Sequence, residues 1–377
     1  MGIVMVSSVI CVGTAVAHLL RKAIKLAYLN ARESVLSLLP KDRLEDAPSR
    51  PVDSVLVISQ RRLGDIALEI PSLLALRTCC EEARLGIVAP RAYHPLLFWA
   101  CRPDVLIEYP RGLQAMRALG AALRIQSWQV VVDLTTDYHL APARLARASR
   151  APIRIGFENS GRGHYFNIVI PNVKDEHMAD RFRRPIELLG VDFRNVPSLP
   201  DLQEQPVTLP TKEPGSYLVG MHPGAIHWTQ RWPAEYFADL AVRIHQTGDC
   251  CLVLGGESDR ALIEEICRLS NGAVVSALTG ESILQLAATL KRLDLLICNN
   301  SGPLHLADLL DIPTLSFMGP TVKELWWPRS FRARVLRCDD LACIGCNQGY
   351  CRVGTHACMT AITPDTAYEA FRSLKER

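Results

Sequence analysis

The residues in this sequence that could do chemistry gather in short polar loops, each preceded by an apolar run typical of a buried strand. Asp65 closes the first of these loops, Gln60–Asp65. It could act as a general base if burial or a nearby carboxyl raised its pKa from about 3.9. The same carboxylate could instead cap the helix predicted to begin there, which is its commoner role. Gly64, beside it, would let the chain turn sharply.

A second loop follows the predicted strand Tyr217–His222 and contains the run WTQRWP, from Trp228 to Pro233. A guanidinium group binds an oxyanion through two parallel hydrogen bonds, so Arg231 in this run suits a phosphate clamp. An aromatic surface loop with a cation–π contact is an equally simple interpretation. The proline at the end of the run favours the start of a helix.

The third loop, Asn299–Pro303, lies between an apolar run and a helix that carries His305. Backbone N–H groups at the start of a helix point outward without partners, so Ser301 and Gly302 could receive a phosphate there, although many such turns bind nothing. A fourth loop, Gly255–Asp259, places carboxylates just beyond a predicted strand. These could accept hydrogen bonds from ribose hydroxyls, or cap the next helix.

Strands alternate with helices on both sides of a proline-rich connector, Pro197–Gly215, which predicts an α/β protein with two parallel sheets. Two doubly wound domains would place a cleft between the carboxyl ends of their sheets, where open α/β sheets bind ligands. The expected domains are residues 51–200 and 215–362, preceded by an N-terminal segment and linker at 1–50. The final segment, 363–377, is expected to be a helix that packs back across both domains.

The composition, 49% hydrophobic and 21% charged over 377 residues, is that of an ordinary globular protein of two domains. A net charge of +3 is too small to suggest a nucleic-acid partner. Basic residues are dense in Arg21–Lys25, Arg144–Arg154 and Arg181–Arg184, which we interpret as solvated helix faces. The motifs of P-loop ATPases, nicotinamide-binding folds, serine hydrolases and zinc proteases do not occur in the sequence. Nor does a D-x-D pair that could hold a metal ion on a diphosphate.

The N-terminal stretch Ile3–Leu20 contains no acidic or basic side chain apart from one histidine, and its length is at the lower limit for a membrane span. Basic residues follow it, which by the positive-inside rule leaves the rest of the chain in the cytoplasm. A cleaved signal peptide is an alternative, but the charged segment that opens such peptides is missing. Helical spacing of apolar residues from Leu19 to Leu39 predicts an amphipathic helix that lies on a membrane or packs on the first domain.

Three blocks of the sequence resemble one known family. VLVISQRRLGDIALEIPSLLALR (Val55–Arg77) resembles the first block of the ADP-heptose:lipopolysaccharide heptosyltransferases, glycosyltransferase family 9. GMHPGAIHWTQRWPAEYFADLA is similar to the second block and NNSGPLHLADLLDIPTLSFMGPT to the third. The blocks occur in the family's order and spacing, and the resemblance extends from about Val55 to Lys375.

The resemblance implies a GT-B architecture, with the acceptor bound mainly by the first domain and the nucleotide-sugar by the second. It also implies inverting transfer that requires no cofactor for catalysis. Asp65 matches the family's proposed catalytic base, and Arg61, Arg62 and Gly64 would lie on the acceptor-side loop. The donor- and phosphate-binding positions fall on Thr229, Arg231, Asn300, Ser301, Gly302 and His305, and the ribose-binding positions on Asp259 or Glu257.

The implied partners are ADP-heptose as donor, a lipopolysaccharide core or similar lipid-linked saccharide as acceptor, and the cytoplasmic face of the inner membrane. Two other functions fit the same fold. A nucleotide-sugar epimerase would need no acceptor but more acid and base carboxylates, and a catalytically silent scaffold would only bind a sugar nucleotide. The family's donor loop usually begins with Asp where this chain has Asn300, which bears on the sugar hydroxyls that are recognised.

The chain has 13 cysteines, and eight of them are scattered through apolar segments, as expected of reduced thiols that fill a core. The other five lie close together between Cys338 and Cys358. Four of these could hold a structural zinc or iron ion, although the spacing is not that of two C-x-x-C pairs. Reduced thiols or disulfides are the simpler alternative. The four candidate ligands are Cys343, Cys346, Cys351 and Cys358.

Overall fold

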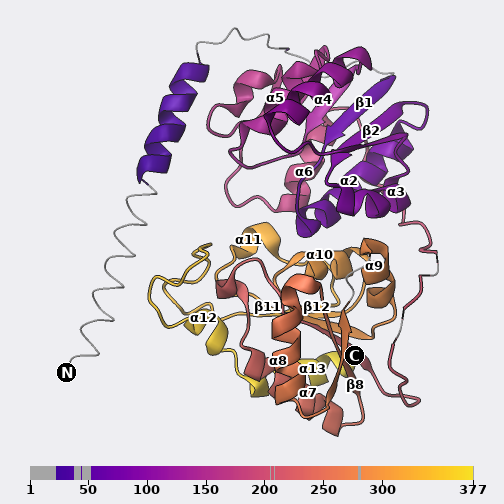
Figure 1. Ribbon diagram of the computed structural model, residues 1–377, viewed down its shortest axis with the longest axis vertical. Coiled ribbons are helices and arrows are strands. Elements are labelled where there is room, and N and C mark those ends of the chain that lie inside the picture. The colour runs from indigo at the N-terminus through magenta and orange to yellow at the C-terminus, as the bar shows by residue number, and fades with distance from the viewer. Residues whose placement is uncertain are drawn as a thin grey trace.

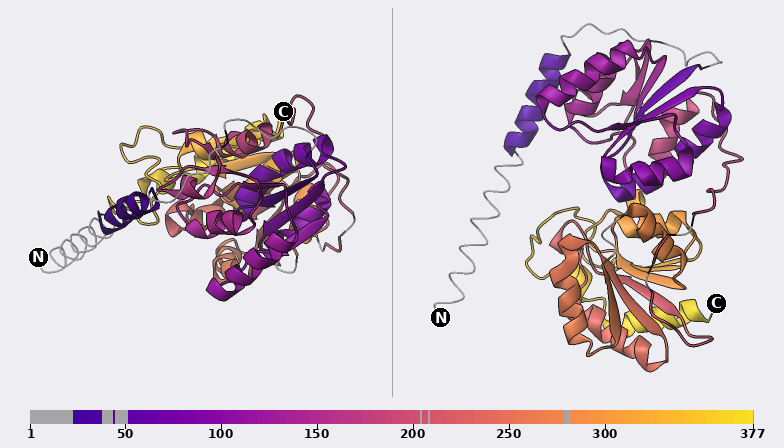
Figure 2. Two further views of the ribbon diagram at one scale, coloured as in Figure 1. Left: turned by 90° about the horizontal axis from the view of Figure 1, so that it is seen from above. Right: turned by 45° about the vertical axis from the view of Figure 1, so that its right-hand side comes forward.

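The computed structural model describes residues 23–37, 44, 52–203, 205–207, 209–278 and 282–376, so the predicted membrane segment at 3–20 lies outside the described residues. Two α/β domains follow one another along the chain (Figure 1). Each contains a sheet of six strands that are all parallel, with helices on both faces (Figure 2). The α/β class and the GT-B architecture predicted from the sequence are confirmed.

The first sheet has the strand order β3-β2-β1-β4-β5-β6. Its central strand β1 is an uninterrupted apolar run, which is typical of a parallel strand covered on both faces. The strands are β1 (Ser54–Ile58), β2 (Arg84–Ala89), β3 (Val105–Glu108), β4 (Val130–Asp133), β5 (Ile153–Phe157) and β6 (Ile168–Ile170). The helices are α2 (Leu63–Cys79), α3 (His94–Cys101), α4 (Leu113–Ile125), α5 (Leu140–Ala148) and α6 (Met178–Glu187).

The second sheet has the order β12-β11-β10-β7-β8-β9, which is the same doubly wound arrangement. In both sheets the strand order reverses at the centre, between β1 and β4 and between β10 and β7. The strands are β7 (Leu218–His222), β8 (Cys250–Gly255), β9 (Val274–Leu278), β10 (Leu295–Asn299), β11 (Thr314–Phe317) and β12 (Ala333–Leu336). The helices are α7 (Ala234–Gln246), α8 (Arg260–Leu269), α9 (Ile283–Lys291), α10 (Gly302–Leu309), α11 (Lys323–Trp326), α12 (Ala357–Thr360) and α13 (Pro364–Lys375).

The two domains meet where α2 packs on α10, and both helices contribute to one apolar core (Figure 1). Glycines allow this close approach. A Cβ on Gly302 would lie 2.8 Å from the Cβ of Leu63, and a Cβ on Gly64 would lie 3.0 Å from Cδ2 of His305. The absence of a side chain at these two positions therefore sets the distance between the domains.

Two predictions from the sequence were wrong. The last helix, α13, does not lie across both domains, because it packs on α7 and β12 and joins the core of the second domain. The basic run Arg144–Arg154 is not wholly a solvated helix face either. Arg154 is buried in β5, where its guanidinium donates to the carbonyls of Ala151 and Tyr165.

A fully buried ion pair fixes the loop that follows β4. Nη2 of Arg162 donates to Oδ2 of Asp133 at 2.6 Å, and both side chains are 0% exposed. The same guanidinium donates to the carbonyls of Thr135 and Asp137, so one side chain holds the whole turn after the strand. Removal of one partner would leave a buried charge without compensation.

We expect Gly302→Val to separate the domains, because its side chain would collide with Leu63. Small-angle X-ray scattering should show a larger radius of gyration, while the far-ultraviolet circular dichroism spectrum stays unchanged. Gly256→Val is the matched control, since no atom lies within 4 Å of the position that its Cβ would take. Equal radii for the two variants would contradict the role given to Gly302.

We expect Arg162→Met to lower the free energy of unfolding by about 3–5 kcal/mol, because it leaves the carboxylate of Asp133 buried and unpaired. Urea denaturation measures the change. Arg194→Met, which breaks an exposed ion pair with Asp192, should have no measurable effect. A small effect of both substitutions would show that the buried pair does not stabilise the fold.

Candidate active site

A cavity of about 210 Å³ lies between the domains, at the carboxyl ends of their sheets. The first domain contributes the start of α2, and the second contributes the loops after β7 and β10. The structure thus brings together residues of three of the loops singled out in the sequence. The cavity is lined by Arg62, Gly64, Asp65, Ile226, His227, Gln230, Asn300, Ser301, Gly302, His305, Thr321, Trp326 and Asn347.

Asp65 lies in the first turn of α2 and is only 9% exposed. It does not cap the helix, because the cap position is taken by Arg62. Within the described part of the chain, the carboxylate has neither a hydrogen bond nor an ion pair. Burial raises its pKa from 3.8 to about 6, while the charge of Arg62 lowers the pKa and that of Asp137 raises it. Asp65 is therefore ionised at neutral pH and free to accept a proton.

Glu69, one turn along α2 from Asp65, holds the loop that precedes the helix. Its carboxyl oxygens lie 2.5 Å from Oγ of Ser59 and 2.9 Å from the amide nitrogen of Gln60. Burial raises the pKa of Glu69 well above its ordinary range. The Gln60 side chain in turn donates to the carbonyl of Leu134, which ties this loop to the one after β4. Sequence reasoning missed Glu69 because it lies within an apolar helical run.

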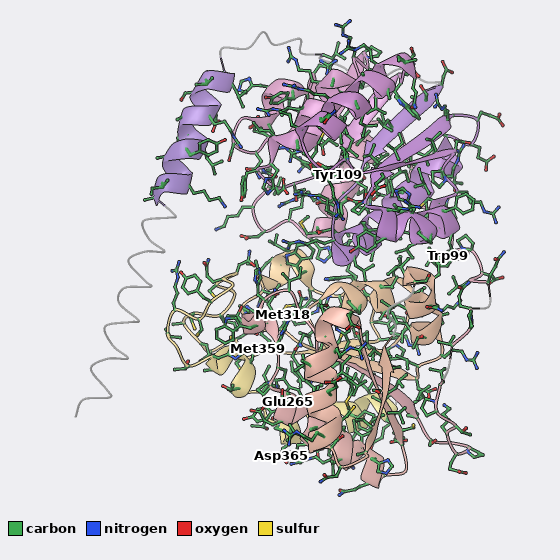
Figure 3. The ribbon with its side chains drawn as sticks, in the orientation of Figure 1. Trp99, Tyr109, Glu265, Met318, Met359 and Asp365 are labelled. Carbon is green, nitrogen blue, oxygen red and sulfur yellow. The ribbon has the colours of Figure 1, made fainter. Side chains whose placement is uncertain are left out.

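A second set of contacts lies on the outer side of the same loop. The guanidinium of Arg61 forms a 2.8 Å ion pair with Asp137, which follows β4. It also lies over the ring of Tyr109, 5.7 Å from the ring centroid. Tyr109, labelled in Figure 3, directly follows β3 in the first domain. Arg61 and Arg62 are exposed, so this side of the cleft presents positive charge beside Asp65.

The loop after β10 faces Asp65 from the second domain. Ser301 is the cap residue of α10, and its hydroxyl lies 3.4 Å from Nδ1 of His222. Asn300 is 8% exposed, and its amide donates to the carbonyl of Trp326. Helix α10 begins at Gly302. Pro303 has no N–H group and that of Leu304 donates to the carbonyl of Ser301, so in this first turn Gly302 is the residue whose N–H could bind an anion at the cleft.

His305 is buried beneath this loop, next to Gly64 and the ring of Trp326. Burial lowers its pKa to about 4, so the imidazole is neutral at physiological pH. Its Nδ1 is buried and has no hydrogen-bond partner among the described residues. A buried ring nitrogen without a partner at a cleft suits a hydrogen bond to a ligand.

The loop after β7 is held in shape by hydrogen bonds between its own residues. Arg231 donates through Nε and Nη2 to the carbonyl of Ala225, which closes the loop on itself. The charge of Arg231 also lowers the pKa of the buried His222, although burial of His222 is the larger cause. Thr229 is buried, and its hydroxyl donates to the carbonyl of Gln348. Arg231 thus lies near the cleft but does not line the cavity, and Thr229 contacts the cysteine-rich segment instead.

The two candidate ribose-binding carboxylates point in different directions. Asp259 lies against the loop after β7, with Oδ2 at 3.9 Å from Nε2 of His222. A Cβ on Gly224 would come within 2.6 Å of its Oδ1. Glu257 is exposed and pairs with Arg260 on the helix that follows.

Asn299, which ends β10, is a buried residue whose position the sequence could not reveal. Its side-chain oxygen accepts from the amide of Trp232, and its Nδ2 donates to the carbonyl of Pro223. One amide group thereby fixes the loop after β7 relative to the loop after β10.

Known proteins resemble this chain in sequence. The sequence model of glycosyltransferase family 9 (heptosyltransferase) matches residues 116–356. This chain belongs to glycosyltransferase family 9.

Among relatives of this family 9 chain, lipooligosaccharide heptosyltransferase 2 of Campylobacter jejuni is 30% identical over 164 residues. That match covers 42% of this chain and about half (51%) of the relative's length. Lipopolysaccharide heptosyltransferase 2 of Salmonella typhimurium is 25% identical over 85% of this chain and 98% of its own. The solved structure of Escherichia coli ADP-heptose lipopolysaccharide heptosyltransferase II has the same fold, with a TM-score of 0.70 at 21% identity over 86% of this chain and 98% of that one.

The cysteine-rich segment of this family 9 chain lies beside the loop after β7, which it contacts through Gln348 and His356. Its five cysteines, Cys338, Cys343, Cys346, Cys351 and Cys358, are free thiols. Burial, with the neighbouring Cys346, Cys343 and Cys351, raises the pKa of Cys358 to about 11, so the four candidate ligands lie near one another. The described residues nevertheless contain no group of three or more His, Cys, Asp or Glu side chains arranged to hold a metal ion. The arrangement therefore does not fit a four-thiolate metal centre.

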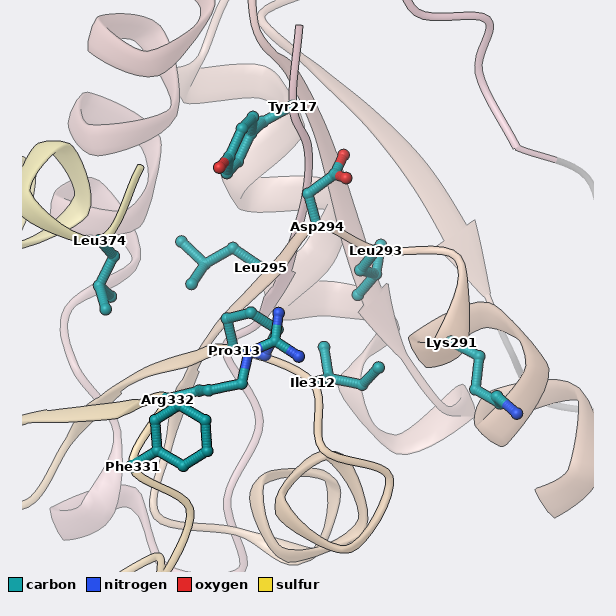
Figure 4. Close-up of a pocket in the computed structure, with 10 residues that line it drawn as sticks. All are labelled: Tyr217, Lys291, Leu293, Asp294, Leu295, Ile312, Pro313, Phe331, Arg332 and Leu374. Carbon is teal, nitrogen blue, oxygen red and sulfur yellow. The ribbon is translucent and has the colours of Figure 1, made fainter. Parts of the chain in front are cut away.

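A larger cavity, of about 510 Å³, lies at the opposite edge of the second sheet (Figure 4). It is bounded by residues that precede or begin strands, including Tyr217, Asp294, Pro313 and Arg332. Asp294 is already paired with Lys212 and the amide of Leu218. Parallel α/β sheets bind ligands at their carboxyl ends, so we place the active site in the smaller cavity between the domains.

We expect the carboxyl group of Asp65 to titrate near pH 6, because burial disfavours its charged form. Arg62→Gln removes a cation and should raise this pKa, whereas Asp137→Asn removes an anion and should lower it. Nuclear magnetic resonance titration of protein labelled at aspartate carboxyl carbons measures the three values. A wild-type pKa close to 3.8 would contradict the description of the site.

Proposed function

We propose that this chain transfers heptose from ADP-heptose to a lipopolysaccharide core or a similar lipid-linked saccharide. Membership of glycosyltransferase family 9 supports glycosyl transfer, and the names of the relatives support heptose as the sugar. One observation carries the proposal. Asp65, a buried carboxylate without a partner among the described residues, lines the same cavity as Ser301 and Gly302 at the start of α10.

In the proposed reaction, Asp65 is the catalytic base. An acceptor hydroxyl reaches it from the side of Arg61 and Arg62, and the carboxylate takes the proton as the oxygen attacks the anomeric carbon. The bond from that carbon to the diphosphate oxygen breaks on the opposite face, so a single displacement inverts the configuration. A pKa near 6 leaves the base ionised at neutral pH while making it a stronger proton acceptor than an ordinary aspartate.

The departing diphosphate is stabilised by fixed positive charge and hydrogen-bond donors. We assign it to the N–H group of Gly302 at the start of α10, with the charge of Arg231 in the neighbouring loop. Neutral His305 can form a hydrogen bond to the donor through its free Nδ1. Because the sequence has no D-x-D pair, we propose that transfer requires no divalent metal ion.

Asp259 is the better of the two candidates for the ribose hydroxyls. It lies beside His222 at the carboxyl edge of the sheet, as a ribose-binding carboxylate requires. Glu257 would first have to leave its ion pair with Arg260. Asn300 replaces the acidic residue usual in the family, so we propose that it contacts the donor as a neutral hydrogen-bonding group.

We place the reaction at the cytoplasmic face of the inner membrane, because the proposed acceptor is attached to a lipid. No helix among the described residues is long and apolar enough to cross a bilayer. The uncharged stretch Ile3–Leu20 and the basic residues after it support attachment to that face.

We expect purified protein to bind ADP-heptose more tightly than ADP or UDP-sugars without added metal, as measured by calorimetric titration. Asp65→Asn should keep this affinity, since the amide has nearly the same shape, while turnover falls by about 10²–10⁴-fold through loss of the base. Asp192→Asn, an exposed substitution far from the cleft, is the control and should retain full turnover.

Each outcome has a distinct meaning. Preference for a UDP-sugar would contradict the donor, and Asn300 would be the first position to exchange for Asp. Full turnover of Asp65→Asn would contradict its role as base. Absence of binding to all these nucleotides would contradict the proposed function itself.

A further inference from the structure

The helix at residues 23–36 lies beside the first domain and packs on it by one side only (Figures 1 and 2). Leu36 is buried in the core with Tyr165 and Leu145, and Leu29 and Arg32 are half-buried. These positions are three and four residues apart, which places them on one face of the helix. The remaining faces have no covering element among the described residues.

An apolar stripe runs along the side of the helix next to this packed face. Ile24, Tyr28 and Val35 are 61%, 61% and 65% exposed, and Ala31 between them is also exposed. They recur at intervals of four, three and four residues, so their side chains project in one direction. Large apolar side chains gathered on one exposed stripe mark an interaction surface.

Charge and sequence context identify the partner. Arg21, Lys22 and Lys25 precede or open the helix, and the stretch Ile3–Leu20 before them has no acidic or basic residue except a histidine. An apolar stripe flanked by basic side chains is typical of a helix that lies in the surface of an anionic membrane. A second copy of this chain would bring the same positive charges together, which disfavours self-association.

We propose that the helix at residues 23–36 is an interfacial helix that rests on a bilayer containing anionic phospholipid. Its stripe of Ile24, Tyr28, Ala31 and Val35 faces the acyl chains, and the basic residues Arg21 and Lys22, which precede it in the sequence, supply the charge that anionic headgroups attract. Only the purpose of this lipid contact rests on the proposed function: it would hold the enzyme beside a lipid-linked acceptor.

Arg32 fastens this helix to the first domain. Its Nε and Nη2 donate to the carbonyl of Ser160 at 3.1 and 2.6 Å, and its Nη1 donates to the carbonyl of Tyr138 at 2.9 Å. Gly161, with a positive φ of 83°, allows the helix to sit close, because a Cβ there would be 3.2 Å from Cα of Glu33. Nζ of Lys25 lies 3.9 Å from the centroid of the Tyr138 ring.

The anchoring point belongs to the segment after β4, which contacts the loop that carries Asp65. Tyr138 follows Asp137, which pairs with Arg61 on the acceptor-side loop and raises the pKa of Asp65. A bilayer in contact with the helix would therefore lie on the side of the molecule from which the acceptor is proposed to enter.

The test is co-sedimentation of the full chain with vesicles of phosphatidylethanolamine and phosphatidylglycerol. Tyr28→Glu and Val35→Glu should each weaken binding about tenfold, because a carboxylate replaces apolar contact with the acyl chains. Leu26→Glu is the matched control, since Leu26 is similarly exposed, at 58%, but lies off the stripe. Its affinity should fall by no more than about fivefold, because one charge near an anionic surface contributes about 1 kcal/mol.

Equal weakening by all three substitutions would overturn the assignment of the stripe. So would unchanged binding of Tyr28→Glu and Val35→Glu, which would place the lipid contact elsewhere in the chain. Tight binding to pure phosphatidylcholine vesicles would overturn the requirement for anionic lipid. Vesicle binding requires no donor or turnover, so these outcomes are independent of the proposed transfer reaction.

Arg32→Ala tests the link to the active site separately. Vesicle binding should persist, while amide hydrogen exchange in residues 134–139 becomes faster because the carbonyl of Tyr138 loses its partner. Ser34→Ala on the exposed side of the same helix is the control and should leave this exchange unchanged. Unchanged exchange in Arg32→Ala would show that the helix does not stabilise the segment at residues 134–139.

Discussion

The close contact between α2 and α10 is the constraint on which the candidate active site depends. Gly64 and Gly302 lack side chains where the two domains meet, so the start of each helix can approach the other. Each helix begins at the carboxyl end of a central strand, which is where parallel sheets present their loops. The contact therefore brings the carboxylate of Asp65 in one domain to the first turn of α10 in the other without any long insertion.

Buried polar groups fix the loops that this contact brings together. Glu69 holds the loop before α2, Arg162 holds the turn after β4, and Asn299 joins the loops after β7 and β10. Each of these side chains makes two or more hydrogen bonds to backbone or buried side-chain atoms. Loops fixed in this way keep the reacting groups in place before a substrate arrives, which lowers the reorganisation needed for catalysis.

Much of the fold could be predicted from the sequence, because apolar runs and turn residues mark parallel strands and the helices between them. The predicted strand Tyr217–His222 corresponds to β7, and the helix predicted in the final segment corresponds to α13. The region around β5 and β6 was not predicted. Arg154 occupies a buried position in β5, where a charged residue is not expected. The role of Asp65 as a base stays a prediction. The carboxyl groups of Glu69 and Asp137, which influence the same loop, depend on contacts between distant segments, which no local pattern reveals.

The pKa of Asp65 also depends on whether the two domains are in contact. Part of its burial comes from the second domain, because Gly64 beside it meets His305. Movement of the domains apart would let water reach the carboxylate and return it toward an ordinary, weaker base. Under the proposed mechanism, Asp65 would therefore be a strong proton acceptor only while the two domains are closed, and an open enzyme would activate water against the proposed sugar nucleotide only weakly.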